Sequence, residues 1–96
     1  MRVELADEAE AQVSAIDSWW REHRPTAPDL FTQELEHALG LLKDVPTLGV
    51  NYDEAKKIRR MLLPKTGHHV YFTQRAEVLL VVALWSGRRG QGPPLP

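Results

Sequence analysis

The sequence contains no cysteine, which excludes several kinds of site at the outset. Without thiols the chain forms no disulfide, binds no metal through thiolates and has no cysteine nucleophile. The four histidines offer no substitute, because His23 and His37 fall in separate predicted helices while His68 and His69 are adjacent on a predicted strand. Adjacent strand residues point to opposite faces, so this spacing does not resemble a zinc site. We therefore expect no metal and no cofactor.

The sequence also lacks a targeting signal and a membrane span. Its first residues, MRVELADEAEAQV, have neither the basic start nor the long apolar stretch of a signal peptide. No apolar run approaches the length of a transmembrane helix. These absences predict a cytoplasmic protein that does not associate with a membrane.

Charge is divided unevenly along the 96 residues, although the formal net charge is only -1. Residues 1–54 hold 4 Lys/Arg and 12 Asp/Glu, whereas residues 55–96 hold 8 Lys/Arg and a single acid, Glu77. If the two halves form different surfaces, the second suits an anionic partner. The alternative is that the oppositely charged halves neutralise each other within the fold.

The first half of the chain predicts a short strand followed by two helices. The strand covers residues 2–5, and Asp7 with Glu10 predicts a capping box that opens a helix running to about His23. The apolar positions of this helix repeat at spacings of four, three and four, which places Trp20 on the buried stripe and Trp19 beside it.

The second helix is expected to follow a break at Pro25. Thr26 is a plausible N-cap, and Pro28 is tolerated in the first turn. The apolar residues of this helix repeat in the same way as those of the first: Phe31, Leu35, Ala38 and Leu42. Two helices joined by so short a link should pack as an antiparallel hairpin.

The second half of the chain predicts a sheet. Residues 47–57 are expected to form a loop after the second helix, since Pro46 and Gly49 end it. Three runs rich in β-branched, aromatic and aliphatic residues then predict an antiparallel meander of three strands, at 58–63, 68–72 and 77–85. The last run has no polar alternation between Val78 and Leu84, so we expect it in the middle of the sheet.

The resulting order is strand, helix, helix, strand, strand, strand, which is an α+β fold. Residues 1–89 are expected to form the single domain. Residues 90–96, GQGPPLP, contain glycine and proline with little to bury, and they predict a flexible tail.

Motifs in this order are typical of a known family. The stretches are WWREHRPTAPDLFTQELEHALGLLKDVPTLG, IRRMLL, HHVYF and VVALWSGRR. With the β-αα-βββ order, they resemble the RelE/ParE superfamily of bacterial toxins from type II toxin-antitoxin modules. The resemblance covers residues 1–89. Where the family often has His before the terminal arginines, this chain has Trp85, Ser86 and Gly87, and Phe72 replaces the second aromatic of the family's VYY strand.

The resemblance implies one of two activities. ParE-like toxins, often associated with plasmid stabilisation, bind DNA gyrase and stall it on broken DNA. RelE-like toxins cleave mRNA on the ribosome without a metal, which requires a base, a cation and an acid around the scissile phosphate. The ParE-like branch is favoured, because no Tyr or His follows Leu84 and because the helical hairpin is more acidic than an RNA-binding surface normally is. A third hypothesis is a non-toxic protein-interaction module on the same fold.

The resemblance also implies partners. A ParD-like antitoxin should neutralise the toxin in a hetero-oligomer, with a segment that becomes ordered on the toxin surface. Its apolar residues are expected along the helical hairpin and its acidic residues near Arg59, Arg60 and the sheet. Operator DNA would be bound through the antitoxin only.

Six residues are predicted to contact the target or the antitoxin: Trp19, Arg59, Arg60, Trp85, Arg88 and Arg89. If the chain is a nuclease, the catalytic candidates are His69, Arg59, Arg60 and Arg88, since imidazole titrates near neutral pH and arginine pairs with phosphate. Structural roles are the alternatives. In these alternatives one arginine of 59 and 60 satisfies backbone carbonyls or pairs with acids, Arg88 and Arg89 end a strand, and Trp19 covers a sheet edge.

Overall fold

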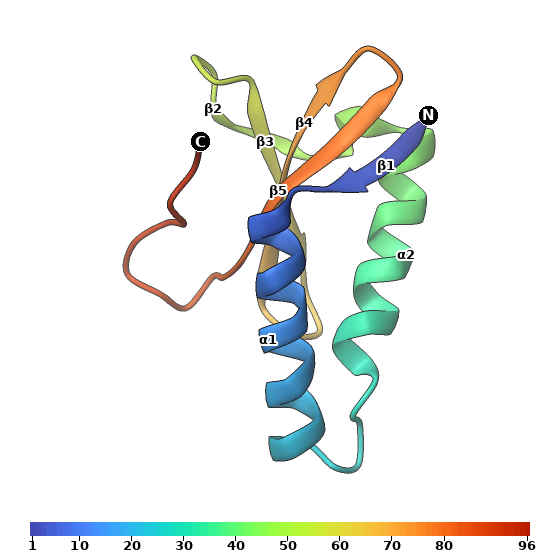
Figure 1. Cartoon of the computed structure of the whole chain (residues 1–96), viewed down its shortest axis with the longest axis vertical. Helices are drawn as coiled ribbons and strands as arrows, with labels where there is room; N and C mark the ends of the chain where they lie inside the picture. The colour runs from blue at the N-terminus through green and yellow to red at the C-terminus, as the bar shows by residue number, and fades with distance from the viewer.

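The structure, a computed structural model, describes all 96 residues as one sheet with two helices. The elements in chain order are β1 (Arg2–Leu5), α1 (Asp7–His23), α2 (Leu30–Asp44), the 3-10 helix η1 (Pro46–Leu48), β2 (Val50–Asp53), β3 (Ile58–Leu63), β4 (His68–Arg75) and β5 (Val78–Ser86). The strand order across the sheet is β1-β5-β4-β3-β2 (Figure 1). The predicted α+β class is confirmed, and the predicted elements occur in the predicted order, with η1 and β2 in addition.

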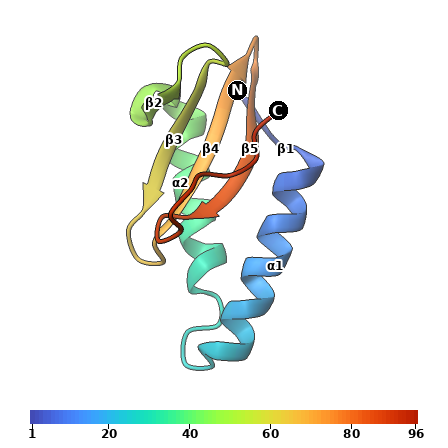
Figure 2. The same cartoon turned by 90° about the vertical axis from the view of Figure 1, so that its left-hand side faces the viewer.

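The sheet is antiparallel except at one edge, where β1 runs parallel to β5. The two helices run in opposite directions side by side (Figures 1 and 2), as the short link predicts. Both helices and one face of the sheet share a core that includes Phe31, Leu42, Phe72 and Leu84. Strand β5 lies between β1 and β4, which agrees with its unbroken apolar run.

The start of α1 differs from the prediction. Ala6 is the N-cap and has an extended backbone, with no side-chain capping bond. The physical reason is that the Ala6 N–H donates to the carbonyl of Val81 at 2.9 Å, so the end of β1 holds Ala6 against the sheet. Asp7 therefore becomes the first helical residue, and the predicted capping box with Glu10 is wrong. Their carboxylates still lie in the first turn, where the helix dipole favours negative charge.

The start of α2 also differs. The helix begins at Leu30, four residues after the predicted cap Thr26, and Asp29 is the N-cap without a side-chain capping bond. The Asp29 carboxylate instead accepts a hydrogen bond of 2.7 Å from Arg21, which also donates to Asp17 at 3.1 Å. This pairing ties the end of α1 to the start of α2 and leaves the link as turns.

The prediction of a loop over residues 47–57 is wrong for part of that range. Residues 46–48 form η1, and Val50–Asp53 pair with β3 as the edge strand β2. The sequence signal is weak because three of the four residues of β2 are exposed, so the strand depends on pairing with β3 rather than on burial. At Gly49 an added Cβ would lie 2.6 Å from the Phe72 ring and 2.9 Å from the carbonyl oxygen of Arg60. Any residue larger than glycine would therefore clash at this position.

The turn between β3 and β4 is held by a side chain from α2. The Glu34 carboxylate accepts hydrogen bonds from the backbone N–H of Lys65 at 2.6 Å and of Thr66 at 3.0 Å, and from the Thr66 hydroxyl at 2.7 Å. Gly67 follows with a φ of 81°, which favours glycine. This turn sets the position of His68 and of the side chains around it.

Candidate functional site

Five polar or aromatic side chains share the face of the sheet that is turned away from the helices. Four of them lie on β3, β4 and β5, where side chains alternate between the two faces of the sheet, and Tyr52 lies on the edge strand β2. We call them the sheet-face cluster: Tyr52, Arg60, His69, Tyr71 and Trp85.

The cluster is organised around the guanidinium of Arg60. This group lies 5.0 Å from the centre of the Tyr52 ring and donates to the Tyr71 hydroxyl at 3.4 Å. The two tyrosine rings meet edge to face at 4.8 Å, and the ring of His69 lies 6.1 Å from that of Tyr71. At protein interfaces, arginine and aromatic residues are enriched among those that contribute most of the binding energy.

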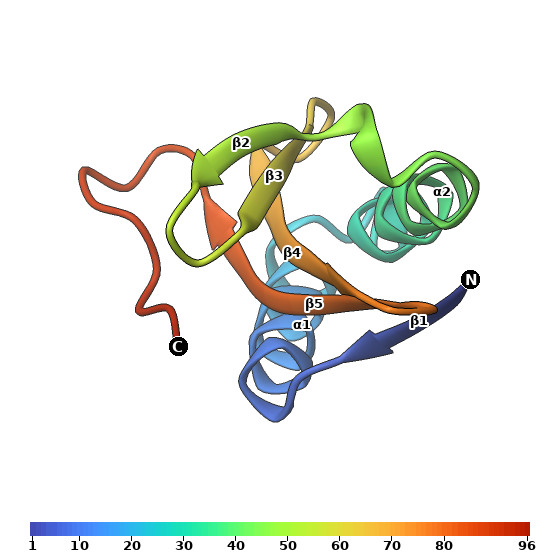
Figure 3. The same cartoon turned by 90° about the horizontal axis from the view of Figure 1, so that it is seen from above.

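The C-terminal residues run along the same side of the sheet, away from α2 (Figure 3). The indole N–H of Trp85 donates to the carbonyl of Gln91 at 2.9 Å, and the guanidinium of Arg89 lies 4.2 Å from the centre of the Trp85 ring. Leu95 packs against a small core of the sheet that includes Val82. The structure therefore gives residues 90–96 a defined course, while their flexibility stays a prediction.

Arg59 points to the opposite face and has a structural environment. Its guanidinium donates to the Asn51 side chain at 2.8 Å, to the Thr47 carbonyl at 3.0 Å and to the Gly49 carbonyl. Thr47 and Gly49 belong to the segment that joins α2 to β2, and Asn51 belongs to β2 itself. Arg59 thus satisfies backbone carbonyls, one of the alternatives open from the sequence, and it fixes the edge strand.

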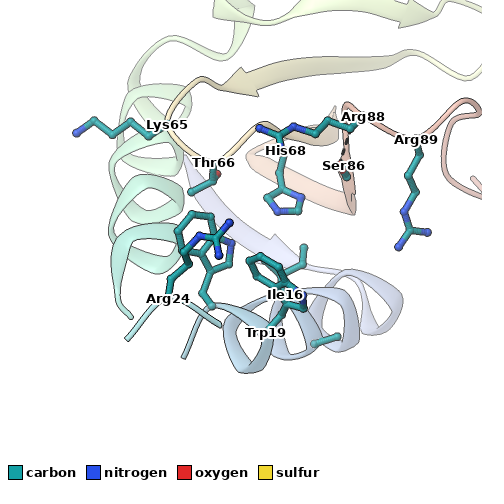
Figure 4. A pocket seen from close by; sticks show the side chains of 11 residues that line it. Ile16, Trp19, Arg24, Lys65, Thr66, His68, Ser86, Arg88 and Arg89 are labelled. Carbon is teal, nitrogen blue, oxygen red and sulfur yellow. Dashed lines mark hydrogen bonds between the residues drawn. The ribbon is translucent and has the colours of Figure 1, made fainter. Parts of the chain in front are cut away.

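The second candidate region is a cavity of about 550 Å³ on the helix side, between α1, the β3–β4 turn and the end of β5 (Figure 4). We call it the helix-side cavity, and eleven residues line it: Ala15, Ile16, Trp19, Trp20, Arg24, Lys65, Thr66, His68, Ser86, Arg88 and Arg89. None of the eleven is acidic. Trp19 is 44% exposed, whereas Trp20 packs against the core, which agrees with the helical pattern.

The two adjacent histidines fall on opposite faces. His68 lies on the helix side, with its ring 5.3 Å from that of Phe31, and His69 belongs to the sheet-face cluster. Burial lowers the pKa of His68; Glu34 opposes this effect, and Arg89 and Arg88 add to it. Burial also lowers the pKa of His69, and Arg60 adds to the effect. In both residues the protein therefore favours the neutral imidazole over the charged form.

These two histidines predict a loss of stability on acidification. Below the unfolded-state histidine pKa of about 6.5, the unfolded chain takes up protons that the folded chain does not, so the free energy of unfolding falls with pH. Above that pH the contribution is fully present. Urea unfolding between about pH 7.5 and 5.5 should show a smaller loss for the His68→Gln/His69→Gln variant than for the unchanged protein. The exposed His37→Gln is the matched control, and an equal loss in all three proteins would refute the prediction.

The structure does not bring all the nuclease candidates together. His69 and Arg60 share the sheet face, but Arg59 lies on the opposite face. Arg88 lines the helix-side cavity with His68. A phosphate on the sheet face would therefore meet one of the three proposed arginines beside the proposed base.

Tyr52, Tyr71 and Arg24 were not among the site residues predicted from the sequence. Tyr52 and Tyr71 complete the sheet-face cluster, and Arg24 lies over the Trp19 ring at 5.2 Å in the helix-side cavity. A signal existed for Tyr71, since it alternates with His69 on one strand. None existed for Tyr52, which lay in a predicted loop.

A further surface is apolar and exposed. Along α2, η1 and β2, several large side chains are at least 39% exposed: Leu41, Val45, Leu48, Val50 and Tyr52. A groove of about 380 Å³ between α2 and β3 adjoins this strip and includes Leu41 and the exposed Leu62. Exposed apolar strips of this kind mark sites of protein association.

The structure contains no group of three or more His, Asp or Glu side chains that could hold a metal ion. No helix has the length and apolar character needed to span a bilayer.

Comparison with known proteins decides the family. A family model described as the ParE toxin of the type II toxin-antitoxin system, parDE, matches residues 3–90. The chain belongs to the ParE toxin family. A solved structure described as the chromosomal ParDE toxin-antitoxin system from P. aeruginosa contains a similar chain, with a TM-score of 0.75 and 16% identity, and the match covers 90% of this chain and 95% of that one. At this identity the likeness shows the fold. A search of curated proteins found no match.

Proposed function

We propose that this ParE-family chain is a cytoplasmic toxin that arrests growth by binding DNA gyrase and that a ParD-like antitoxin neutralises it. The observation that carries the proposal is the family match over residues 3–90, nearly the whole chain. The chemistry of the surface agrees with action by binding, because its two polar regions are rich in arginine and aromatic side chains.

The sheet-face cluster is the proposed contact with the target. Arg60 and Trp85 are its central residues, and Arg89 stacks on Trp85 at the edge. Trp19 and Arg88 lie on the helix side, at the rim of the cavity, and they stay predicted partner contacts. Arg59 supports the surface through the edge strand and does not touch the partner.

The exposed apolar strip is the proposed seat of the antitoxin. It includes the edge strand β2, whose free backbone groups can pair with an added strand. An antitoxin segment that is disordered alone would become ordered along this strip and the adjoining groove. Its acidic residues would meet Arg60 and the neighbouring cations, and operator DNA would be bound by the antitoxin alone.

Gyrase supercoiling with the purified chain tests the proposal. We expect inhibition that grows with toxin concentration and disappears when a ParD-like antitoxin from the same operon is added in equal amount. Ribosome-bound mRNA should stay intact under the same conditions. Active gyrase together with ribosome-dependent mRNA cleavage would overturn the gyrase assignment.

The second candidate is a RelE-like endoribonuclease. The observation that favours it is the placement of His69 on one face with Arg60 and Tyr71, a possible base beside a cation. This candidate predicts that His69→Ala abolishes mRNA cleavage, whereas the binding toxin requires no proton transfer. If induction of the chain alone causes no growth arrest, both toxin hypotheses fail and the interaction module is left.

A further inference from the structure

The helix-side cavity carries positive charge that the fold does not neutralise. Arg24, Arg88 and Arg89 line it, and the three ion pairs of the structure involve only Arg2 and Arg21 among the basic residues. The Glu34 carboxylate, which acts electrostatically on His68, already accepts three hydrogen bonds from the β3–β4 turn. The arginines are therefore available to an anion from outside the chain.

The arginines face the cavity from two sides. Figure 4 shows Arg24 beside Trp19 on the α1 side, with Arg88 and Arg89 across from them at the end of β5. Lys65 points away from the other labelled side chains. Guanidinium groups bind phosphate bidentately, and Arg24 and Arg88 on two sides of the cavity suit a ligand with several negative charges.

Other polar groups in the cavity also lack partners. Nδ1 of His68 is buried and makes no hydrogen bond. The Ser86 oxygen accepts from the Arg88 backbone N–H at 3.2 Å, which leaves its hydroxyl hydrogen free to donate. The Thr66 hydroxyl, by contrast, already donates to Glu34. The cavity thus offers a free hydroxyl donor and an imidazole nitrogen in addition to the arginines.

The rest of the lining is apolar and partly flat. Ile16, Trp19 and Trp20 form its apolar part, and the two indoles meet edge to face at 5.8 Å. Small-molecule sites combine such apolar walls with a few polar groups, in cavities of about 300–1,000 Å³. The volume of about 550 Å³ lies within this range. The Trp19 ring already stacks on that of His23 at 4.7 Å, so a planar group such as a nucleobase would lie against Ile16 and the remaining indole surface.

We infer that the helix-side cavity binds a nucleoside polyphosphate, with the phosphates on Arg24 and Arg88 and the base against the apolar wall. A free nucleotide is favoured over a nucleic-acid strand because α1 carries several exposed acids, including Glu22, and these would repel a long phosphate backbone that extends beyond the cavity. It is favoured over an acidic peptide because a phosphate offers more charge and more acceptor oxygens to a guanidinium than a carboxylate does. Arg89 stacks on Trp85 of the sheet-face cluster, whereas Arg24 and Arg88 belong to the cavity alone, so the inference does not depend on gyrase as the target.

NMR titration of the full chain tests the inference. Addition of ATP or GTP should shift the indole N–H signals of Trp19 and Trp20 in a saturable way and leave that of Trp85 in place. Affinity should rise from the nucleoside monophosphate to the triphosphate. Arg24→Gln and Arg88→Gln should each weaken binding about tenfold, since each removes charge-assisted hydrogen bonds.

Matched controls are available on the same chain. Arg75→Gln and Lys56→Gln remove exposed cations that do not line the cavity, so both should bind the triphosphate with unchanged affinity. Circular dichroism of each variant checks that the fold is retained.

Several results would overturn the inference. These are unmoved Trp19 and Trp20 signals, inorganic phosphate binding as tightly as the triphosphate, or equal weakening by the control variants. If a short oligonucleotide binds more tightly than the triphosphate, the ligand of the cavity is a nucleic-acid strand. If a poly-glutamate peptide binds more tightly, the ligand is an acidic protein segment. All of these are read on the purified chain, so failure here is distinguishable from failure to inhibit gyrase.

Discussion

Replacing Arg59 by alanine is expected to lower the free energy of unfolding by about 2 to 3 kcal/mol. The substitution removes the donors for the carbonyls of Thr47 and Gly49 and for the side chain of Asn51. Gly49 is buried, so its carbonyl loses a partner where water does not readily replace it. The loss is moderated because Nε of Arg59 is itself buried without a partner in the native structure.

Urea unfolding measures this loss, with Arg75→Ala as the matched control. Arg75 is an exposed arginine at the end of β4, and its replacement should change stability by less than about 0.5 kcal/mol. Hydrogen exchange should also show the amides of β2 opening more often in Arg59→Ala. Equal stability of the two variants would show that Arg59 does not hold the edge strand.

Replacing the next residue, Arg60, should have little effect on stability and a large effect on target binding. Arg60→Ala loses a cation–π contact with Tyr52 and a long hydrogen bond to Tyr71, so stability should fall by less than about 1 kcal/mol. Under the proposed function, its target affinity should fall at least about thirtyfold, as for a central arginine of a protein interface. The concentration needed to inhibit gyrase supercoiling measures this change.

Two further variants sharpen that measurement. Arg60→Lys keeps the charge but not the planar fork, so it should recover only part of the inhibition. Arg75→Ala should inhibit as well as the unchanged protein. If Arg60→Ala keeps full potency while Arg59→Ala loses it at equal stability, the two arginines have been assigned to the wrong roles.

The sequence determined most of the element order, because periodicity is a local property. The buried stripe of α1 separates Trp20 from Trp19, and the unbroken apolar run of β5 requires a central strand. Alternation along β3 also requires Arg59 and Arg60 to face opposite sides. These conclusions need only the spacing of apolar and polar residues along the chain.

Only the tertiary structure decided which arginine faces which side, since alternation does not say where the helices lie. Both helices also begin at other residues than the sequence predicted, because Ala6 pairs with β5 and Asp29 pairs with Arg21. Strand β2 and the helix-side cavity arise from contacts between residues far apart in sequence. Such contacts leave no local period, and for this reason the cavity of Arg24, His68 and Arg88 was not predictable from the sequence alone.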